Sequence, residues 1–186
     1  MSALAMTTTR SADGNLRAPF TYMLKGKIMP DPTIVHNTFV VEKSYPVSAE
    51  RLFAAFTDPV KKRRWFVEGP NKIVESYNLD FRIGGNELVR YSYAEGSPFP
   101  NTTFTNSVNY QVILPERRVV FANTMAMGDH IFSAALVSFE LIPTETGTDL
   151  VCTHQAAFFE PSDGPQIREA GWRTLLDRLG AELEQE

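Results

Sequence analysis

The sequence contains a single cysteine, Cys152, and therefore lacks the pair of thiols that an internal disulfide requires. It also lacks any cluster of cysteine and histidine at the spacing of a zinc site, so we expect no structural metal. These absences are typical of a protein from a reducing, cytoplasmic compartment. No cation stands beside Cys152 in the sequence to lower its pKa, which predicts a buried and unreactive thiol.

A long apolar run and a surplus of positive charge are also absent. No apolar stretch approaches the roughly 18 residues of a membrane span, and the N-terminal MSALAMTTTRSADGN lacks the apolar segment of a signal peptide. Lysine and arginine number 18 against 22 aspartate and glutamate residues, whereas a nucleic-acid-binding domain usually presents a basic face. The sequence thus predicts no membrane span, no secretion and no nucleic-acid partner.

The common catalytic motifs are missing as well. The sequence has no nucleophile elbow, phosphate-binding loop or dinucleotide fingerprint, so it predicts no cofactor and gives little support to a generic enzyme. Function must therefore be inferred from the fold and from the side chains that the fold encloses.

Composition divides the chain near residue 33. Residues 1–33 show no lasting hydrophobic period, which predicts a flexible or loosely docked N-terminal extension. Regular alternation begins near Ile34, and a hydrophobic content of 43% in 186 residues suffices for one sizeable core. We therefore expect a single domain at residues 34–186.

The domain is predicted to open with a strand and two short helices. The β-branched and aromatic segment TFVVEKSY predicts a strand that ends at Pro46. The segment VSAERLFAAFTD then has helical spacing, with Ser48 as its N-terminal cap. Asp58 and Pro59 predict the start of a second helix, because proline is tolerated at the first helical position.

The stretch KKRRWF, residues 61–66, places four consecutive cations before two aromatic side chains. We expect solvated cations at a helix end, where each stabilises the helix dipole by about 0.3–1 kcal/mol, and the alternative is contact with an anionic partner. Consecutive helical residues point about 100° apart, so four of them cannot form one flat patch. Trp65 and Phe66 are expected to turn inward and bury their area.

The remainder of the chain is predicted to form strands followed by one long helix. We expect strands at residues 72–80, 81–94, 104–114, 117–125, 131–143 and 148–158. Short connections make consecutive strands antiparallel. A long amphipathic helix follows, with apolar positions 167, 171, 172, 175, 176, 179 and 183 facing the sheet. Its other face is predicted to carry Arg168, Glu169, Arg173, Asp177, Arg178 and Glu182. The fold class is α+β, with a curved antiparallel sheet of about six to seven strands around the C-terminal helix.

Five ordered segments carry a resemblance to a known family. They are VEKSYPVSAERLFAAFTDPVKKRRWF, DFRIGG, ILPERRVVF, VSFELIPTETGTDLVCTH and GWRTLLDRL, and together they span about residues 38 to 183. The sequence resembles the SRPBCC superfamily of START and birch-pollen-allergen-like helix-grip folds. Within it, the sequence is similar to the branch named after the activator of heat-shock protein 90 ATPase, also labelled polyketide-cyclase-like. The resemblance implies an apolar cavity between the sheet and the long helix.

Large side chains that could line such a cavity are abundant. The predicted lining consists of Phe53, Phe56, Trp65, Phe66, Tyr91, Tyr110, Phe121, Phe132, Trp172 and Leu176. Ordinary core packing is the alternative for each of them. Aromatic rings around one helix leave irregular gaps more readily than aliphatic side chains do, which favours a pocket.

A catalyst in the cavity would have to be a titratable group with a shifted pKa. His154 is the candidate catalytic residue, because alternation places it on the covered face of its strand with Leu150 and Cys152; a hydrogen-bonded core histidine is the alternative. Glu87, Arg90 and Tyr91, on the strand after the GG pair, could supply a polar end to the pocket, and a surface position is the alternative for Glu87 and Arg90.

Three functions are compatible with these observations. The first is binding of a small apolar or aromatic ligand in the cavity. The second is a cavity enzyme of cyclase or hydrolase type that uses His154. The third is a protein-interaction role like that of the chaperone ATPase activator, with residues 61–64 among the candidate contacts. A homodimer through an exposed strand or the N-terminal extension is also compatible with the sequence.

Overall fold

The computed structural model describes residues 34–95, 102–159 and 162–185, together with two short strands, β1 (Met23–Leu24) and β2 (Lys27–Ile28). These two strands pair in antiparallel fashion. The chain divides into two compact units, Met1–Ile34 and Val35–Glu186. The predicted flexible extension at residues 1–33 falls mostly outside the described residues and stays a prediction.

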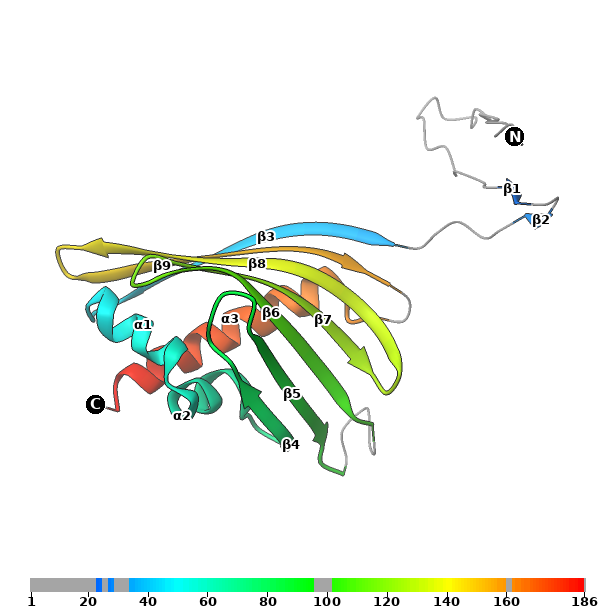
Figure 1. Ribbon diagram of the computed structural model, residues 1–186, viewed down its shortest axis with the longest axis horizontal. Coiled ribbons are helices and arrows are strands. Elements are labelled where there is room, and N and C mark those ends of the chain that lie inside the picture. Colours follow the sequence, from blue (N-terminus) through cyan, green and yellow to red (C-terminus); the bar gives the residue numbers. More distant parts are fainter. Residues whose placement is uncertain (1–22, 25–26, 29–33, 96–101, 160–161, 186) are drawn as a thin grey trace. The chain divides into compact units, whose positions relative to one another are not determined.

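The second unit consists of an antiparallel sheet and its helices (Figure 1). In chain order its elements are β3 (Val35–Tyr45), α1 (Ala49–Thr57), α2 (Pro59–Lys62), the π-helical turn η1 (Arg63–Val67), β4 (Lys72–Leu79), β5 (Asn86–Tyr93), β6 (Phe104–Leu114), β7 (Arg118–Met127), β8 (His130–Thr144), β9 (Gly147–Phe158) and α3 (Gly164–Leu183). The seven strands follow the order β3-β9-β8-β7-β6-β5-β4. The first strand therefore pairs with the last, and β3 and β4 form the two edges.

The predicted α+β class is confirmed, because the sheet curves around α3, which crosses its hollow side (Figure 1). Alternation along β8 buries Val137, Phe139 and Leu141 beneath the sheet. Trp172, Leu176 and Leu179 of α3 are buried in the same core. Burial of these two apolar faces against each other is the main stabilising contribution to the unit.

The predicted helix starts are confirmed by their caps. The Ser48 hydroxyl accepts a hydrogen bond from the Arg51 amide at 3.2 Å. The Asp58 carboxylate accepts from the amides of Val60 and Lys61, and these bonds lower its pKa. After one turn of α2 the chain widens into η1, closed by the Glu68 amide on the Arg63 carbonyl at 2.9 Å. This wider turn places Trp65 and Phe66 in the core, as predicted.

The prediction that all four cations of residues 61–64 are solvated is wrong for Lys62, which is 1% exposed. Its neighbours Lys61, Arg63 and Arg64 are half-buried or exposed. Because successive residues point in different directions, one of the four must face the core. Lys62 is tolerated there because Glu87 supplies an opposite charge 3.5 Å away.

The predicted faces of α3 need four corrections. Ile167 and Gly171, expected to be buried, are exposed, and the exposed fraction of Ile167 is 66%. Arg168 and Glu182, expected in solvent, are buried. Each has a partner of opposite charge: Arg168 binds Asp163, and Glu182 binds Arg64. Ion pairing, which periodicity alone does not reveal, thus brings two charged residues into the helix contact.

The second predicted strand, 81–94, is shorter in the structure, where β5 begins at Asn86. Residues 80–85 form a tight turn instead. Gly84 has a φ of 75°, and a Cβ on Gly85 would lie 2.2 Å from the Asp80 carbonyl oxygen. The two glycines therefore make a turn that side chains would obstruct.

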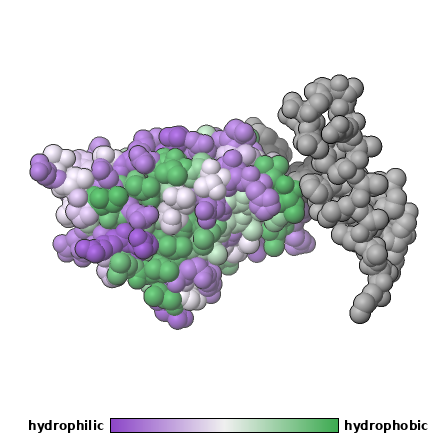
Figure 2. Space-filling view, turned by 90° about the horizontal axis from the view of Figure 1, so that it is seen from above, coloured by the Kyte–Doolittle hydropathy of each residue, from purple (hydrophilic) through white to green (hydrophobic). Residues whose placement is uncertain are grey.

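The face of the sheet opposite α3 is open to solvent. Figure 2, which views the molecule from above Figure 1, shows hydrophobic and hydrophilic residues intermingled on the visible face. Val40 and Leu136 are 47% and 44% exposed. Among the helices of the described residues, none combines the length and the apolar character that a membrane crossing needs.

Candidate functional site

A cavity of about 390 Å³ lies between the hollow side of the sheet and α3. Five aromatic side chains contribute to its lining: Phe66, Tyr91, Tyr93, Phe121 and Trp172. They come from η1, from β5 and β7, and from α3. The size and the aromatic lining are typical of sites for small organic molecules.

The aromatic lining is braced by ring contacts. The Phe66 and Trp172 ring centroids lie 6.1 Å apart, and Tyr91 meets Tyr93 edge to face at 5.6 Å. Trp172 also packs on Phe139 of the core at 5.7 Å. Tilted and edge-to-face contacts of this kind hold the rings of the lining in place.

Two asparagines provide the cavity with amide groups. Asn123 of β7 donates through Nδ2 to Oδ1 of Asn106 on β6 at 3.0 Å. Asn123 is 8% exposed, and its Oδ1 has no hydrogen-bond partner among the described residues. A buried amide oxygen without a partner is costly, and a ligand that donates a hydrogen bond would remove that cost.

The exposed and half-exposed lining residues that lie within residues 69–72 and 163–178 form what we call the rim of the cavity. The rim residues are Gly69, Pro70, Lys72, Asp163, Ile167, Gly171, Thr174, Leu175 and Arg178. Ile167, which leaves the buried stripe of α3, belongs to the rim. At Gly171 an added Cβ would meet no other atom within 4 Å, so the helix surface is bare at this point.

Charge on the rim is mostly positive. Arg168 lies below the rim and binds Asp163 through two hydrogen bonds of 2.8 Å, and it also donates to the Ser133 hydroxyl at 3.0 Å. The Lys72 ammonium lies 4.3 Å from the centre of the Tyr91 ring. Burial and the nearby Arg178 lower the pKa of Lys72 to about 8.

A second polar cluster lies in the core around Lys62. The Lys62 ammonium is enclosed by the rings of Phe56, Trp65, Phe66 and Tyr110, at 4.7 to 5.9 Å from their centres. Tyr110 donates to Glu87 Oε2 at 2.5 Å. Burial lowers the pKa of Lys62, and Glu87 opposes this shift. Four aromatic rings and one carboxylate thus surround the Lys62 charge, and one of these rings, Phe66, also lines the cavity.

Among the described residues, neither Glu87 Oε1 nor the Tyr77 hydroxyl has a hydrogen-bond partner. Burial, followed by the charge of Glu87, raises the pKa of Tyr77 and of Tyr110. Glu87 is 1% exposed, so it takes the interior position and not the surface position that the sequence left open. Arg90 is exposed and lies 3.9 Å from Glu75.

His154 is buried among aromatic rings. Its ring stacks on Phe39 at 4.7 Å and lies 5.9 Å from Trp172. Neither ring nitrogen has a hydrogen-bond partner among the described residues. Burial, followed by the charge of Arg168, lowers the pKa of His154 to about 4. His154 is absent from the cavity lining, and its catalytic role stays a prediction.

Of the ten side chains predicted to line a cavity, four do so: Phe66, Tyr91, Phe121 and Trp172. Phe56, Trp65, Tyr110 and Leu176 are fully buried in the core cluster. Phe53 packs edge to face on Phe81 at 5.9 Å, and Phe132 lies near Phe104 and Arg168.

The cavity residues that sequence reasoning missed include Asn123, Lys72, Gly171 and Arg178. Asn123 could have been found, because alternation with Phe121 places an amide on the covered face of β7. Lys72 is the first residue of β4, and no alternation pattern in the sequence predicts that it lines the cavity.

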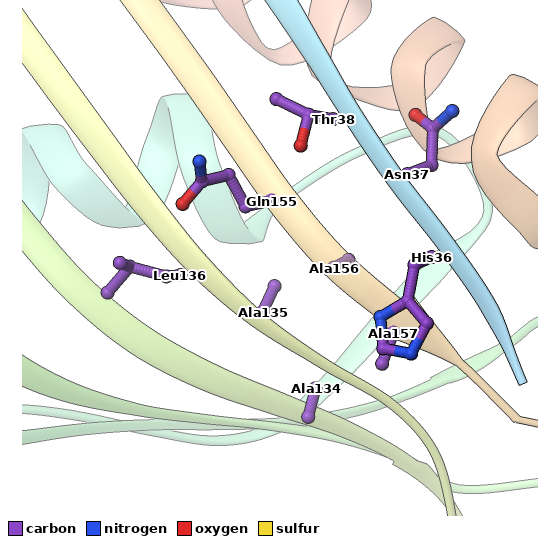
Figure 3. Close-up of a pocket in the computed structure, with 9 residues that line it drawn as sticks. All are labelled: His36, Asn37, Thr38, Ala134, Ala135, Leu136, Gln155, Ala156 and Ala157. Atoms are coloured by element: carbon purple, nitrogen blue, oxygen red, sulfur yellow. The ribbon is translucent and has the colours of Figure 1, made fainter.

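A shallow groove on the outer face of the sheet is the other hollow of note (Figure 3). Its residues come from β3, β8 and β9, and Figure 3 shows the His36 ring beside Ala157, with Gln155 and Leu136 further along the strands. Four of the nine lining residues are alanines. The groove is open to solvent and offers small side chains, so it encloses a ligand less well than the inner cavity.

Among the described residues, no group of three or more histidine, cysteine, aspartate or glutamate side chains could hold a metal ion. Cys152 is buried, and burial raises the pKa of its thiol to about 12. The thiol of Cys152 therefore stays protonated at neutral pH, and Cys152 is not among the residues that line the cavity.

A curved antiparallel sheet around a long C-terminal helix defines the SRPBCC helix-grip class of proteins. The model of the family "Activator of Hsp90 ATPase homolog 1-like protein" matches residues 46–184, and the chain belongs to this family. The resemblance found in the sequence is thereby confirmed.

Solved structures of similar proteins agree with this assignment. The Mll3558 protein of Rhizobium loti is 40% identical, with a TM-score of 0.72 over 81% of this chain and 99% of that one. A protein of Rhizobium leguminosarum is 29% identical, with a TM-score of 0.76 over 83% and 98%. The AHSA1-like protein of Aeromonas hydrophila, 19% identical, shares the fold with a TM-score of 0.59 over 80% and 93%. No curated protein matches the sequence.

Proposed function

We propose that this protein binds a small apolar or aromatic molecule in the cavity between the sheet and α3. The observation that carries the proposal is a preformed hollow of about 390 Å³ with aromatic walls and a buried amide oxygen that lacks a partner. The rings supply hydrophobic contact, and Asn123 supplies a hydrogen-bond acceptor that orients the ligand.

The proposal is tested by thermal unfolding with a mixture of naphthalene, indole and decanol. A ligand that binds only the folded state raises the melting temperature. Gly171→Leu places a side chain on the rim, where a Cβ meets no atom within 4 Å. We expect this variant to gain about 1 kcal/mol from the loss of a helical glycine and to lose the ligand-induced shift.

Ala170→Leu is the matched control, because Ala170 is exposed on the same helix and does not line the cavity. It should keep the ligand-induced shift of the unmodified protein. A protein whose melting temperature is unchanged by all three compounds would contradict ligand binding in the cavity.

The alternative of a protein-interaction surface receives its support from the family and from the exposed cations Arg63 and Arg64. Its test is replacement of Arg63 by serine, with loss of partner binding and an unchanged fold. Lys62 has to be left out of this test, since it is a core residue.

A further inference from the structure

The charges on the rim of the cavity do not balance. Of the three cations that line the cavity, Arg168 is neutralised by Asp163, the one carboxylate of the lining. Lys72 and Arg178 remain. Among the described residues, neither of them has a carboxylate within ion-pair distance. The rim therefore carries two positive charges that have no ion-pair partner among the described residues.

The side chains of these two cations pass beside the same glycine. A Cβ on Gly69 would lie 3.3 Å from Arg178 Nη1 and 3.6 Å from Lys72 Cδ, so both side chains pass beside this glycine. Burial lowers the pKa of Lys72, and the charge of Arg178 adds to this effect. Two like charges at the edge of an apolar cavity repel each other, and an anion between them would turn the repulsion into attraction.

The other groups around Lys72 and Arg178 leave both cations able to bind an anion. Arg178 donates to the carbonyl oxygen of Arg64 at 2.5 Å, which occupies only part of its guanidinium group. Glu68, the nearby carboxylate, is bound to Arg63 at 2.9 Å. The Lys72 ammonium lies over the Tyr91 ring, at 4.3 Å from its centre. Lys72 thus reaches from the rim toward the aromatic wall.

We propose that the ligand of the cavity is an amphipathic anion, whose apolar body lies between Tyr91 and Trp172 and whose carboxylate is bound on the rim by Lys72 and Arg178. This inference rests on the proposed function and adds the chemical class of the ligand. Arginine and lysine hydrogen bonds to a carboxylate are charge-assisted and stronger than neutral ones. A neutral or cationic amphiphile of the same shape lacks that contribution.

The test compares probes of equal shape and different charge. Binding of 2-naphthoate, 2-naphthol and 2-naphthylmethylammonium is measured by titration calorimetry at pH 7, and decanoate and decanol form a second series. We expect each anion to bind about tenfold or more tightly than its neutral analogue. Lys72→Gln and Arg178→Gln should each bring the affinity for 2-naphthoate close to that for 2-naphthol, and so remove most of this preference. Arg117→Gln, which removes an exposed cation remote from the cavity lining, should retain it.

The outcomes separate the two proposals. Equal affinities for anion and neutral analogue, or a preference for the ammonium probe, would overturn the anionic ligand while cavity binding stands. A preference that survives in both glutamine variants would also overturn it. Binding of none of the five probes would overturn both proposals together.

Discussion

At the scale of single residues, the main feature of the interior is a buried pair of opposite charges. Lys62 and Glu87 are each 1% exposed, and their charged atoms lie 3.5 Å apart. Removal of a charge from water is expensive, and it is offset here by four aromatic rings and the carboxylate. The pair fixes the position of α2 against β5, because each charge needs the other.

Replacement of Lys62 by Met tests this dependence. We expect the single change to lower the free energy of unfolding by about 3–5 kcal/mol, because Glu87 is left buried without its counter-charge. The double variant Lys62→Met/Glu87→Leu should recover most of this loss. Urea unfolding of both measures the difference. A single variant within about 1 kcal/mol of the unmodified protein would show that Glu87 does not depend on the lysine charge.

His154 predicts a pH dependence of stability. Its pKa in the folded protein is about 4, below the 6.5 of an exposed histidine, so protonation favours the unfolded chain. As the pH falls from 6.5 to 4, this residue should cost up to about 3 kcal/mol of stability. His154→Phe, which keeps the stacking on Phe39, should lack that part of the acid sensitivity. An equal stability difference between the two proteins at pH 7 and pH 4 would contradict the lowered pKa.

At the scale of elements, the helix starts follow from local chemistry. Ser48 and Asp58 cap α1 and α2 as their residue types predict, and Pro59 stands at the first position of α2. The change from α2 to η1 has no such signal, because a π turn depends on the tertiary burial of Trp65 and Phe66. The same holds for α3, where ion pairs override the periodicity at Arg168 and Glu182.

Asp58→Ala tests the capping of α2. Loss of the two amide bonds should cost about 1 kcal/mol at pH 7, and Asp58→Asn should cost much less because it keeps an acceptor. The carboxylate has a lowered pKa, so the contribution of its charge is present at neutral pH and is lost as the pH falls through the pKa of the folded protein. Chemical unfolding at pH 7 and pH 2.5 measures the loss. A cost for Asp58→Ala that stays constant between these pH values would contradict a contribution from the charged cap.

At the scale of the whole unit, the order of elements is enough to predict the architecture. Strands joined by short turns must lie side by side, and the apolar stripe of the last helix must cover the apolar face of the sheet. The cavity cannot be predicted in this way. Its volume is a small difference between two large quantities, the space under the sheet and the volume of the side chains that fill that space. Phe66 lines it and Phe56 does not, although both are large and buried, and nothing in their spacing separates them.

The most direct measurement is a crystal structure of the protein soaked with 1-bromonaphthalene, in which anomalous scattering locates the bromine. Binding in the cavity predicts a bromine peak between Tyr91, Phe121 and Trp172, with a ring packed against the indole of Trp172. A bromine peak confined to the outer groove of Figure 3, or no peak within the unit, would contradict the central claim that the cavity binds small molecules.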